Sequence, residues 1–136
     1  MPRVSRMVIQ NQTAVYHVMS RTALDGFPLE AFEKDFLLDL IKRMSGLFFT
    51  EVYGFALMGN HFHLLVKMIP GDRYSDEAVK ERLKLFYGEK KAAVGEGQLP
   101  FIREKLASLS EFVREIKVNF TRFYNKRHGR RGYFWG

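Results

Sequence analysis

The stretch FTEVYGFALMGNHFHLLVKM, residues 49–68, decides the fold because it contains two strand-like segments with almost nothing between them. Each of the segments 49–58 and 61–68 is typical of a β-strand. Only Gly59 and Asn60 separate them, and these residue types suit a tight hairpin turn that needs positive φ angles. We therefore predict two antiparallel strands joined by a two-residue hairpin.

The second of these strands begins with two of the chain's four histidines, His61 and His63. Positions i and i+2 of a strand point the same way, so the two imidazoles share one face, and Phe62, Leu64 and Val66 share the other. The apolar face belongs to the core. On the opposite face, two neighbouring imidazoles could hold a divalent metal and leave its other positions for a phosphate oxygen. Two ordinary half-exposed histidines beside a turn are the alternative, which the spacing alone does not exclude.

Toward the N-terminus, the sequence predicts one helix and one further strand. Apolar residues recur at helical spacing over residues 29–47, with Pro28 at the entry and Gly46 near the exit, which indicates an amphipathic helix. Residues 13–20 alternate between apolar and polar side chains and precede a turn-rich segment, which predicts a first strand.

Toward the C-terminus, residues 72–106 have the pattern of a helical insert. Ser75 can cap a helix with two acidic residues in its first turn and an end at Gly88. Residues 99–109 predict a short second helix.

After the insert, Ser108 and Glu111 have the spacing of a capping box, and an apolar stripe marks the buried side of a long helix that ends before His128. The element order is then β-α-β-β-(helical insert)-α. This order predicts an α+β fold with helices packed on one face of an antiparallel sheet. The second face of the sheet is expected to stay partly open.

Positive charge is concentrated near the C-terminus. Residues 112–136 carry seven of the 22 Lys and Arg but one of the 15 Asp and Glu, which accounts for +6 of the net charge of +7. A polyanion can recognise such a patch, and a solubilising helix face is the plainer alternative. Aromatic residues lie among these bases and could stack on unpaired nucleic-acid bases, which favours nucleic acid. The aromatic residues are Phe120, Phe123, Tyr124, Tyr133, Phe134 and Trp135. The predicted nucleic-acid-binding residues are Arg114, Lys117, Arg122, Asn125, Lys126, Arg127, Arg130 and Arg131.

Length and composition indicate one domain over residues 1–136, because 136 residues of which 46% are hydrophobic suffice for a single core. No stretch reaches the roughly 18 consecutive apolar residues of a membrane span, and MPRVSRMVIQNQ lacks the apolar core of a signal peptide. We therefore expect a soluble, cytoplasmic protein without a membrane partner. The absence of cysteine excludes disulfides, thiolate catalysis and thiolate zinc sites.

The remaining two histidines are predicted to be structural. His17 lies in the first strand, where a hydrogen-bonded role is favoured over metal ligation. His128 follows the last helix, whose dipole favours a cation at its C-terminal end.

Four segments together resemble one family. MGNHFHLLV (58–66) resembles the histidine-hydrophobe-histidine (HUH) motif of the single-tyrosine transposases, and within them the REP-associated tyrosine transposases. YHVMSRT (16–22) is similar to the first strand of that branch, FVREIKVNFTRFYNKRHG (112–129) to its basic helix, and RRGYFWG (130–136) to the approach to its final strand. The resemblance runs through the whole chain in order, although the insert is not diagnostic.

The resemblance implies a ferredoxin-like domain that cleaves and rejoins single-stranded DNA at hairpins through a 5′-phosphotyrosine intermediate. It implies that His61 and His63 bind a divalent metal, magnesium or manganese, with Phe62 as the hydrophobe between them. In the family a nearby Gln or Asn completes the metal site, and members often work as dimers. The implied partners are single-stranded or hairpin DNA and, as a homodimer, a second copy of the chain.

The sequence departs from the family at its end. The family's nucleophilic tyrosine and its companion Gln or Asn lie on a helix beyond the final strand, and nothing in residues 1–136 matches that helix. We therefore expect a truncated or shortened chain that lacks the nucleophile, the third metal ligand and the final strand and helix, and that cannot cleave DNA alone. Tyr124 is the substitute candidate for a nucleophile, with a core or base-stacking role as its alternative, and Tyr133 is weaker still.

Three hypotheses about function follow. The first is the DNA-recognition and metal-binding part of an HUH transposase. The second is a non-catalytic nucleic-acid-binding remnant that uses the same surface. The third is a ferredoxin-like sensor of a small ligand or metal with no DNA role, in which the basic helix is only surface; absence of hairpin binding at low salt would favour it.

Overall fold

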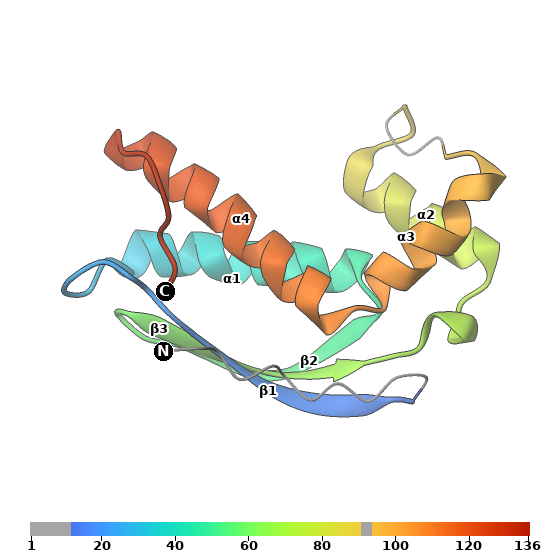
Figure 1. Ribbon diagram of the computed structural model, residues 1–136, viewed down its shortest axis with the longest axis horizontal. Helices are drawn as coiled ribbons and strands as arrows, with labels where there is room; N and C mark the ends of the chain where they lie inside the picture. Colours follow the sequence, from blue (N-terminus) through green and yellow to red (C-terminus); the bar gives the residue numbers. More distant parts are fainter. Residues whose placement is uncertain (1–11, 91–93) are drawn as a thin grey trace.

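The computed structural model describes residues 12–90 and 94–136, and in these residues helices lie on one side of a three-stranded antiparallel sheet (Figure 1). The strands are β1 (Ala14–Arg21), β2 (Thr50–Leu57) and β3 (His61–Met68), in the spatial order β1-β3-β2. The long helices α1 (Ala31–Leu47) and α4 (Leu109–His128) lie over the sheet. The predicted α+β class, element order and one-sided packing are confirmed.

The core forms because β3 alternates as its sequence predicts. Phe62, Leu64 and Val66 are at most 1% exposed and face the helices, whereas His61 and His63 lie on the other face. The two long helices supply the opposing apolar layer. Their buried contributions include Leu37, Leu40, Ile41, Phe112, Ile116 and Phe120.

The hairpin between β2 and β3 forms as predicted, but its glycine has a different role. The described glycines with positive φ are Gly26, Gly88, Gly129 and Gly132, so the positive φ predicted at Gly59 is wrong. A Cβ atom at Gly59 would instead lie 2.8 Å from Cδ1 of Phe27. Glycine is needed here because the segment before α1 crosses the turn closely.

The insert forms a lobe at one end of the molecule (Figure 1). It comprises the 3₁₀ turns η1 (Gly71–Arg73) and η2 (Glu96–Gln98) and the helices α2 (Asp76–Tyr87) and α3 (Leu99–Leu106). The side chain of Ser75 accepts a hydrogen bond from the Ala78 N–H at 3.1 Å, which confirms the predicted cap. Arg82 donates to the carbonyls of Gly46 and Phe48 at 2.9 and 2.8 Å and so ties the lobe to the end of α1.

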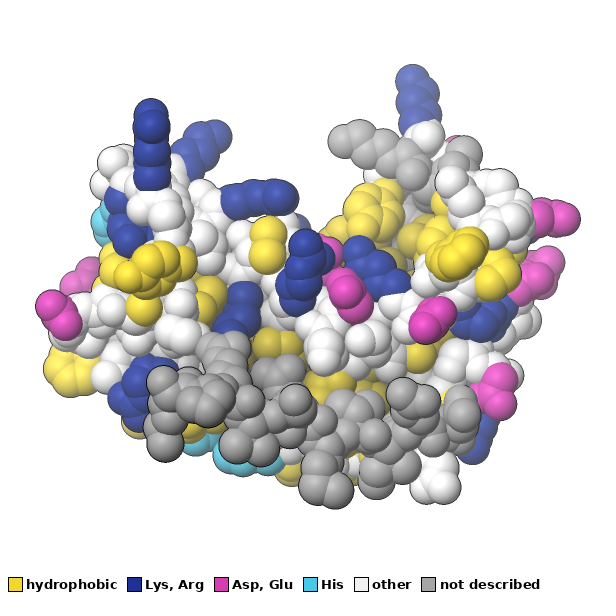
Figure 2. Space-filling view, viewed as in Figure 1, with side chains coloured by type: hydrophobic (Ala, Val, Ile, Leu, Met, Phe, Trp, Pro, Cys, Tyr) yellow, Lys and Arg dark blue, Asp and Glu magenta, His cyan; other side chains and the backbone are white. Residues whose placement is uncertain are grey.

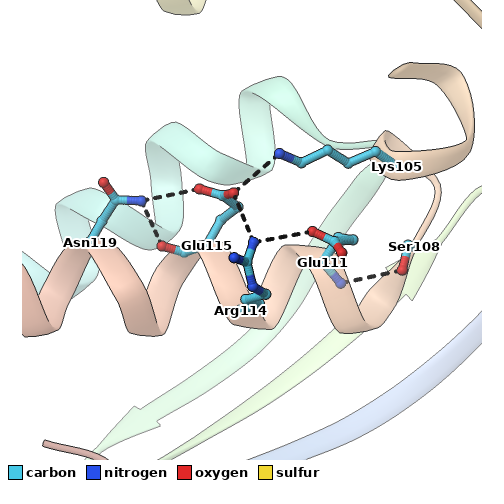
Figure 3. A network of polar contacts seen from close by, with 6 residues as sticks. All are labelled: Lys105, Ser108, Glu111, Arg114, Glu115 and Asn119. Atoms are coloured by element: carbon cyan, nitrogen blue, oxygen red, sulfur yellow. Dashed lines mark hydrogen bonds and ion pairs between the residues drawn. The ribbon is translucent and has the colours of Figure 1, made fainter. Parts of the chain in front are cut away.

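Polar contacts at the start of α4 fix its direction. The Ser108 hydroxyl accepts a hydrogen bond from the Glu111 N–H at 3.2 Å, as the capping box predicts. The carboxylate of Glu111 pairs instead with Arg114, and Glu115 joins Arg114 to Lys105 of α3 (Figure 3). These contacts link the lobe to the first two turns of α4.

The end of α4 and the segment after it bring the chain back to the sheet. The helix includes His128, one residue beyond its predicted end, and Gly129 closes it in the left-handed conformation at φ 60°. Phe134 is fully buried, Trp135 forms an antiparallel bridge with Thr22, and the Gly136 N–H donates to the Arg21 carbonyl at 2.8 Å.

Among the described residues, no helix has the length and apolar character needed to cross a membrane. Residues 1–11, which hold most of the segment predicted to lack the apolar core of a signal peptide, lie outside the described residues.

Candidate metal and DNA-binding site

His61 and His63 project together from the sheet face opposite the helices, as their spacing predicts. Their ring centroids are 5.0 Å apart and the ring planes meet at 84°. In the register of β1 with β3, Arg21 lies opposite His61 and Met19 lies opposite His63. Because directly opposed residues of an antiparallel pair point to the same face, Arg21 and Met19 flank the two imidazoles.

Each of the two imidazoles has its Nδ1 atom engaged by a neighbour. Nδ1 of His61 lies 2.8 Å from Oδ1 of Asn60, an oxygen that can only accept, so this nitrogen carries the proton. Nδ1 of His63 lies 2.9 Å from Nε2 of His17. In each of the two rings, Nε2 is therefore the nitrogen that does not take part in these contacts.

His17 was predicted to be a structural, hydrogen-bonded histidine, and the hydrogen bond is present. The sequence did not reveal that its partner is His63. In the strand register, His17 faces Leu65 and is therefore diagonal to His63 on the same face. Only the register of β1 against β3 brings these residues together, and Arg21 was missed for the same reason.

The environment of His61 favours its neutral form. Desolvation at the sheet surface lowers the pKa of His61, and the charges of Arg21 and His63 lower it further. A neutral imidazole with a protonated Nδ1 presents a lone pair on Nε2, which is the form that binds metal.

The two histidines fit the metal that the resemblance implies, but only as a partial ligand set. Among the described residues, no three His, Asp or Glu side chains are grouped so that they could hold a metal ion. Metal-binding histidines usually donate their second ring nitrogen to an oxygen or another acceptor, and His61 does so with Asn60. The chain therefore offers up to two nitrogen ligands here, and the remaining positions of an ion would belong to oxygen ligands.

The predicted nucleic-acid-binding residues lie on or after α4, on the helix side of the molecule. Figure 2 shows Lys and Arg gathered over α4 at the top, bordering a hollow between α4 and the lobe, with histidine visible beneath the sheet. The cationic helix therefore lies on the side of the sheet opposite the histidine face. The alternating faces of β3 place a full sheet layer between them.

Several predicted bases have partners within the chain. Arg114 pairs with Glu111 and Glu115, and Lys117 also makes intramolecular contacts. Arg130 donates to Oδ1 of Asn125 at 2.7 Å, and the Asn125 amide donates to the Gly132 carbonyl.

Arg122, Lys126 and Arg131 are different, because they are exposed and make no ion pair within the described ranges. These three residues, called the open bases below, are the ones best placed to meet a phosphate backbone.

Arg127 and His128 join a buried carboxylate that the sequence did not single out. Glu33 of α1 is 2% exposed, and its Oε1 atom lies 3.3 Å from Nε2 of His128 and 3.8 Å from the Arg127 guanidinium. Arg127 also lies over the ring of Phe32, 3.9 Å from its centroid. These contacts tie the start of α1 to the last turn of α4, so His128 has a specific partner in addition to the helix dipole predicted for it.

Half of the six aromatic residues proposed for base stacking are buried in the core. Phe120 and Phe134 are fully buried and Tyr124 is 8% exposed, so base stacking by these three is excluded in this fold. Tyr133 is 76% exposed and can still stack on a base.

Tyr124 is placed poorly for the substitute role of nucleophile. It lies in the helix layer, where its ring packs on His128 and Phe134 with centroids 4.1 and 4.4 Å away. Burial raises the pKa of Tyr124, and Glu33 raises it further. A raised pKa disfavours the phenolate, and the histidine pair lies beyond the sheet.

The raised pKa of Tyr124 predicts that this residue makes the free energy of unfolding depend on pH in the alkaline range. A group with a raised folded-state pKa contributes stability that is present below the unfolded value of 10.0 and lost as the pH rises through the folded value. We expect the free energy of unfolding of Tyr124→Phe to fall less than that of the parent protein between pH 9 and 11, measured by urea denaturation. Tyr133→Phe, at an exposed position, is the control, and equal slopes for all three proteins would contradict the prediction.

No protein-family model matches the chain, and no curated protein matches it. Among solved structures, the chain is similar to a REP-associated tyrosine transposase bound to a REP hairpin, with a TM-score of 0.55 and 15% sequence identity. The match covers 100% of this chain and 58% of that one, so the chain spans little more than half the length of its structural neighbour. At this identity the likeness establishes the fold alone, an antiparallel sheet with helices packed on one face.

Proposed function

We propose that this protein binds single-stranded or hairpin DNA as the recognition and metal-binding part of an HUH-type tyrosine transposase. The observation that carries the proposal is the arrangement of His61 and His63, which lie side by side with both Nδ1 atoms engaged and with neither Nε2 atom hydrogen-bonded to a described residue. The fold shared with a transposase bound to a DNA hairpin supports a DNA partner. The open bases on and after α4 supply the cationic surface that a phosphate backbone needs.

Of the two ions that the resemblance implies, manganese suits the histidine pair better. Magnesium prefers an octahedral shell of oxygen ligands, whereas transition metals accept imidazole more readily. A bound ion would supply positive charge that polarises a scissile phosphate. His61 and His63 would hold the ion, and Arg21 lies beside them as a further cation for the same phosphate.

A DNA strand that contacts both the open bases and the histidine pair must pass around one end of the sheet. The segment 130–136 runs along that end, since it starts at α4 and Gly136 hydrogen-bonds Arg21. Arg21 in turn lies opposite His61. The proposed route therefore runs from α4 past Arg131 and Arg21 to the histidines.

We further propose that the 136-residue chain does not cleave DNA by itself. The burial of Tyr124 in the helix layer supports this, and it also favours the alternative of a non-catalytic DNA-binding protein over an active nuclease. Incubation with a hairpin oligonucleotide and Mn²⁺, followed by a denaturing gel, tests the point. A covalent adduct that disappears in Tyr124→Phe would show the proposal to be wrong.

Metal binding is the decisive test of the histidine pair. We expect His61→Ala and His63→Ala each to weaken Mn²⁺ binding by more than the roughly 10–100-fold typical of changes outside the ligand set, measured by electron paramagnetic resonance of the free ion. His128→Ala removes the same side chain on the helix side and serves as the control. Equal Mn²⁺ affinity in the parent protein and both pair variants would refute the metal site.

A further inference from the structure

We propose that His17 is a positioning residue that holds His63 in the tautomer able to bind metal. The inference rests on the proposed function, because it concerns the same histidine pair. It assigns to β1 a role in the site that the HUH motif, which lies entirely in and beside β3, does not contain.

The geometry of the two rings identifies the contact as a hydrogen bond between edges. The planes of His17 and His63 differ by 8°, their centroids are 5.1 Å apart, and the facing nitrogens are 2.9 Å apart. Parallel rings stacked face to face could not bring two nitrogens this close without overlap, so the rings lie nearly in one plane. An N–H of one ring then points directly at the lone pair of the other.

The proton count in this contact decides what His63 can bind. When both rings are neutral, one proton lies between Nε2 of His17 and Nδ1 of His63. If His17 donates it, His63 carries its own proton on Nε2 and has no lone pair to give a metal. If His63 donates it from Nδ1, the Nε2 atom of His63 has a free lone pair, and His17 carries its proton on Nδ1. Only the second arrangement is compatible with a metal on Nε2 of His63.

The same logic already operates on the neighbouring ligand. Asn60 accepts the Nδ1 proton of His61 at 2.8 Å and so fixes that ring with its Nε2 lone pair available. His17 occupies the equivalent position for His63. Each histidine of the pair thus has one acceptor behind it, one from the hairpin turn and one from β1, as outer partners of metal-binding histidines commonly are arranged.

A role in stability alone does not account for His17. The side chain of His17 is exposed on the open face of β1, whereas Val18 and Ser20 are the buried residues on the core side of the strand. Removing the imidazole therefore leaves the apolar core intact. This makes His17 suitable for substitution, because the protein is expected to fold without it.

The test compares two substitutions of His17 that differ in hydrogen bonding. Leucine in His17→Leu has no acceptor, and we expect it to weaken Mn²⁺ binding by roughly 10–100-fold, the range found for outer partners of metal ligands. Glutamine in His17→Gln offers an amide oxygen that can accept the Nδ1 proton, and we expect it to retain affinity within a few-fold. Val15→Leu, on the same strand and face but opposite Lys67 and away from the histidine pair, is the matched control and should bind as the parent does.

A second measurement reports the tautomer directly. In the Zn²⁺-bound parent protein, long-range ¹H–¹⁵N correlation spectra should show His63 protonated at Nδ1 and coordinated through Nε2. His17→Leu should populate a mixture of His63 states under the same conditions, and thermal denaturation should show that all variants remain folded.

The outcomes separate this inference from the proposed function. If the parent protein binds Mn²⁺ through the pair but His17→Leu binds it equally well, or His17→Gln loses as much affinity as His17→Leu, the positioning role is overturned and the metal site stands. If the parent binds no Mn²⁺, the metal step of the proposed function fails, and the role of His17 fails with it.

Discussion

Phe120→Ala is expected to lower the free energy of unfolding by about 3–5 kcal/mol, the range measured when a buried phenylalanine is truncated. The Phe120 ring is fully buried where three parts of the chain meet. Its centroid lies 5.1 Å from that of Phe134, 5.5 Å from that of Trp135 and 6.2 Å from that of Phe36. Removing it opens a cavity that α1, α4 and the C-terminal segment cannot all close.

Phe120→Ala is also expected to affect DNA binding, because Phe120 lies on α4. The same helix carries Arg122 and Lys126, so loosening its buried side also loosens the surface that is proposed to bind DNA. Urea denaturation at neutral pH measures the stability change. Phe101→Ala, at a position 74% exposed on α3, is the matched control and should change stability by less than about 0.5 kcal/mol. Equal effects at the two positions would mean that α4 does not pack as described.

The second large effect concerns the open bases. Replacing Arg122, Lys126 and Arg131 together by alanine should lower the affinity for a single-stranded or hairpin oligonucleotide by roughly 10²–10³-fold at 50 mM salt, if each base neutralises one phosphate. The logarithm of the affinity should also fall less steeply with the logarithm of the salt concentration, by about 0.7 for each contact removed on single strands. Fluorescence anisotropy over a salt series measures both quantities.

Net charge alone must be excluded as the cause. The control removes the same charge from other parts of the surface, through Lys42→Ala, Arg43→Ala and Lys90→Ala together. We expect this control to lose little affinity and to keep the parent salt slope. If the two triple variants lose affinity equally, the interaction is non-specific, and the third hypothesis of a sensor without a DNA role gains support.

The separation of the two surfaces constrains how DNA can be bound. The histidine pair and the open bases lie on opposite sides of the sheet, so no short straight segment of DNA reaches both. A bound strand that used both would have to bend around the end of the sheet where Gly136 meets Arg21. The conformational freedom of unpaired DNA suits this path better than a rigid duplex does.

The local elements of this protein could be predicted from the sequence because each depends on residues that are close together in the chain. The hairpin, the Ser75 and Ser108 caps and the alternation of β3 each depend on residues within a few positions of one another. The projection of His61 and His63 from one face follows from the same two-residue period.

The errors of the sequence reading concern contacts between distant segments. A positive φ was expected at Gly59, yet the glycine is required by Phe27, which lies far outside the turn. Tyr124 and Phe134 were candidates for chemistry or stacking, and both are buried where the segment after α4 folds back on that helix. A turn or helix pattern cannot reveal which remote side chain will pack against it.

The sequence by itself determined the fold class, the order of elements, the shared face of His61 and His63 and the concentration of positive charge near the C-terminus. The tertiary structure alone decided that His17 meets His63, that Glu33 holds Arg127 and His128, and that the basic helix lies across the sheet from the histidines. The physical reason is that periodicity fixes the direction of a side chain relative to its own backbone. Its partner is fixed by strand register and helix packing, which join residues far apart in the chain.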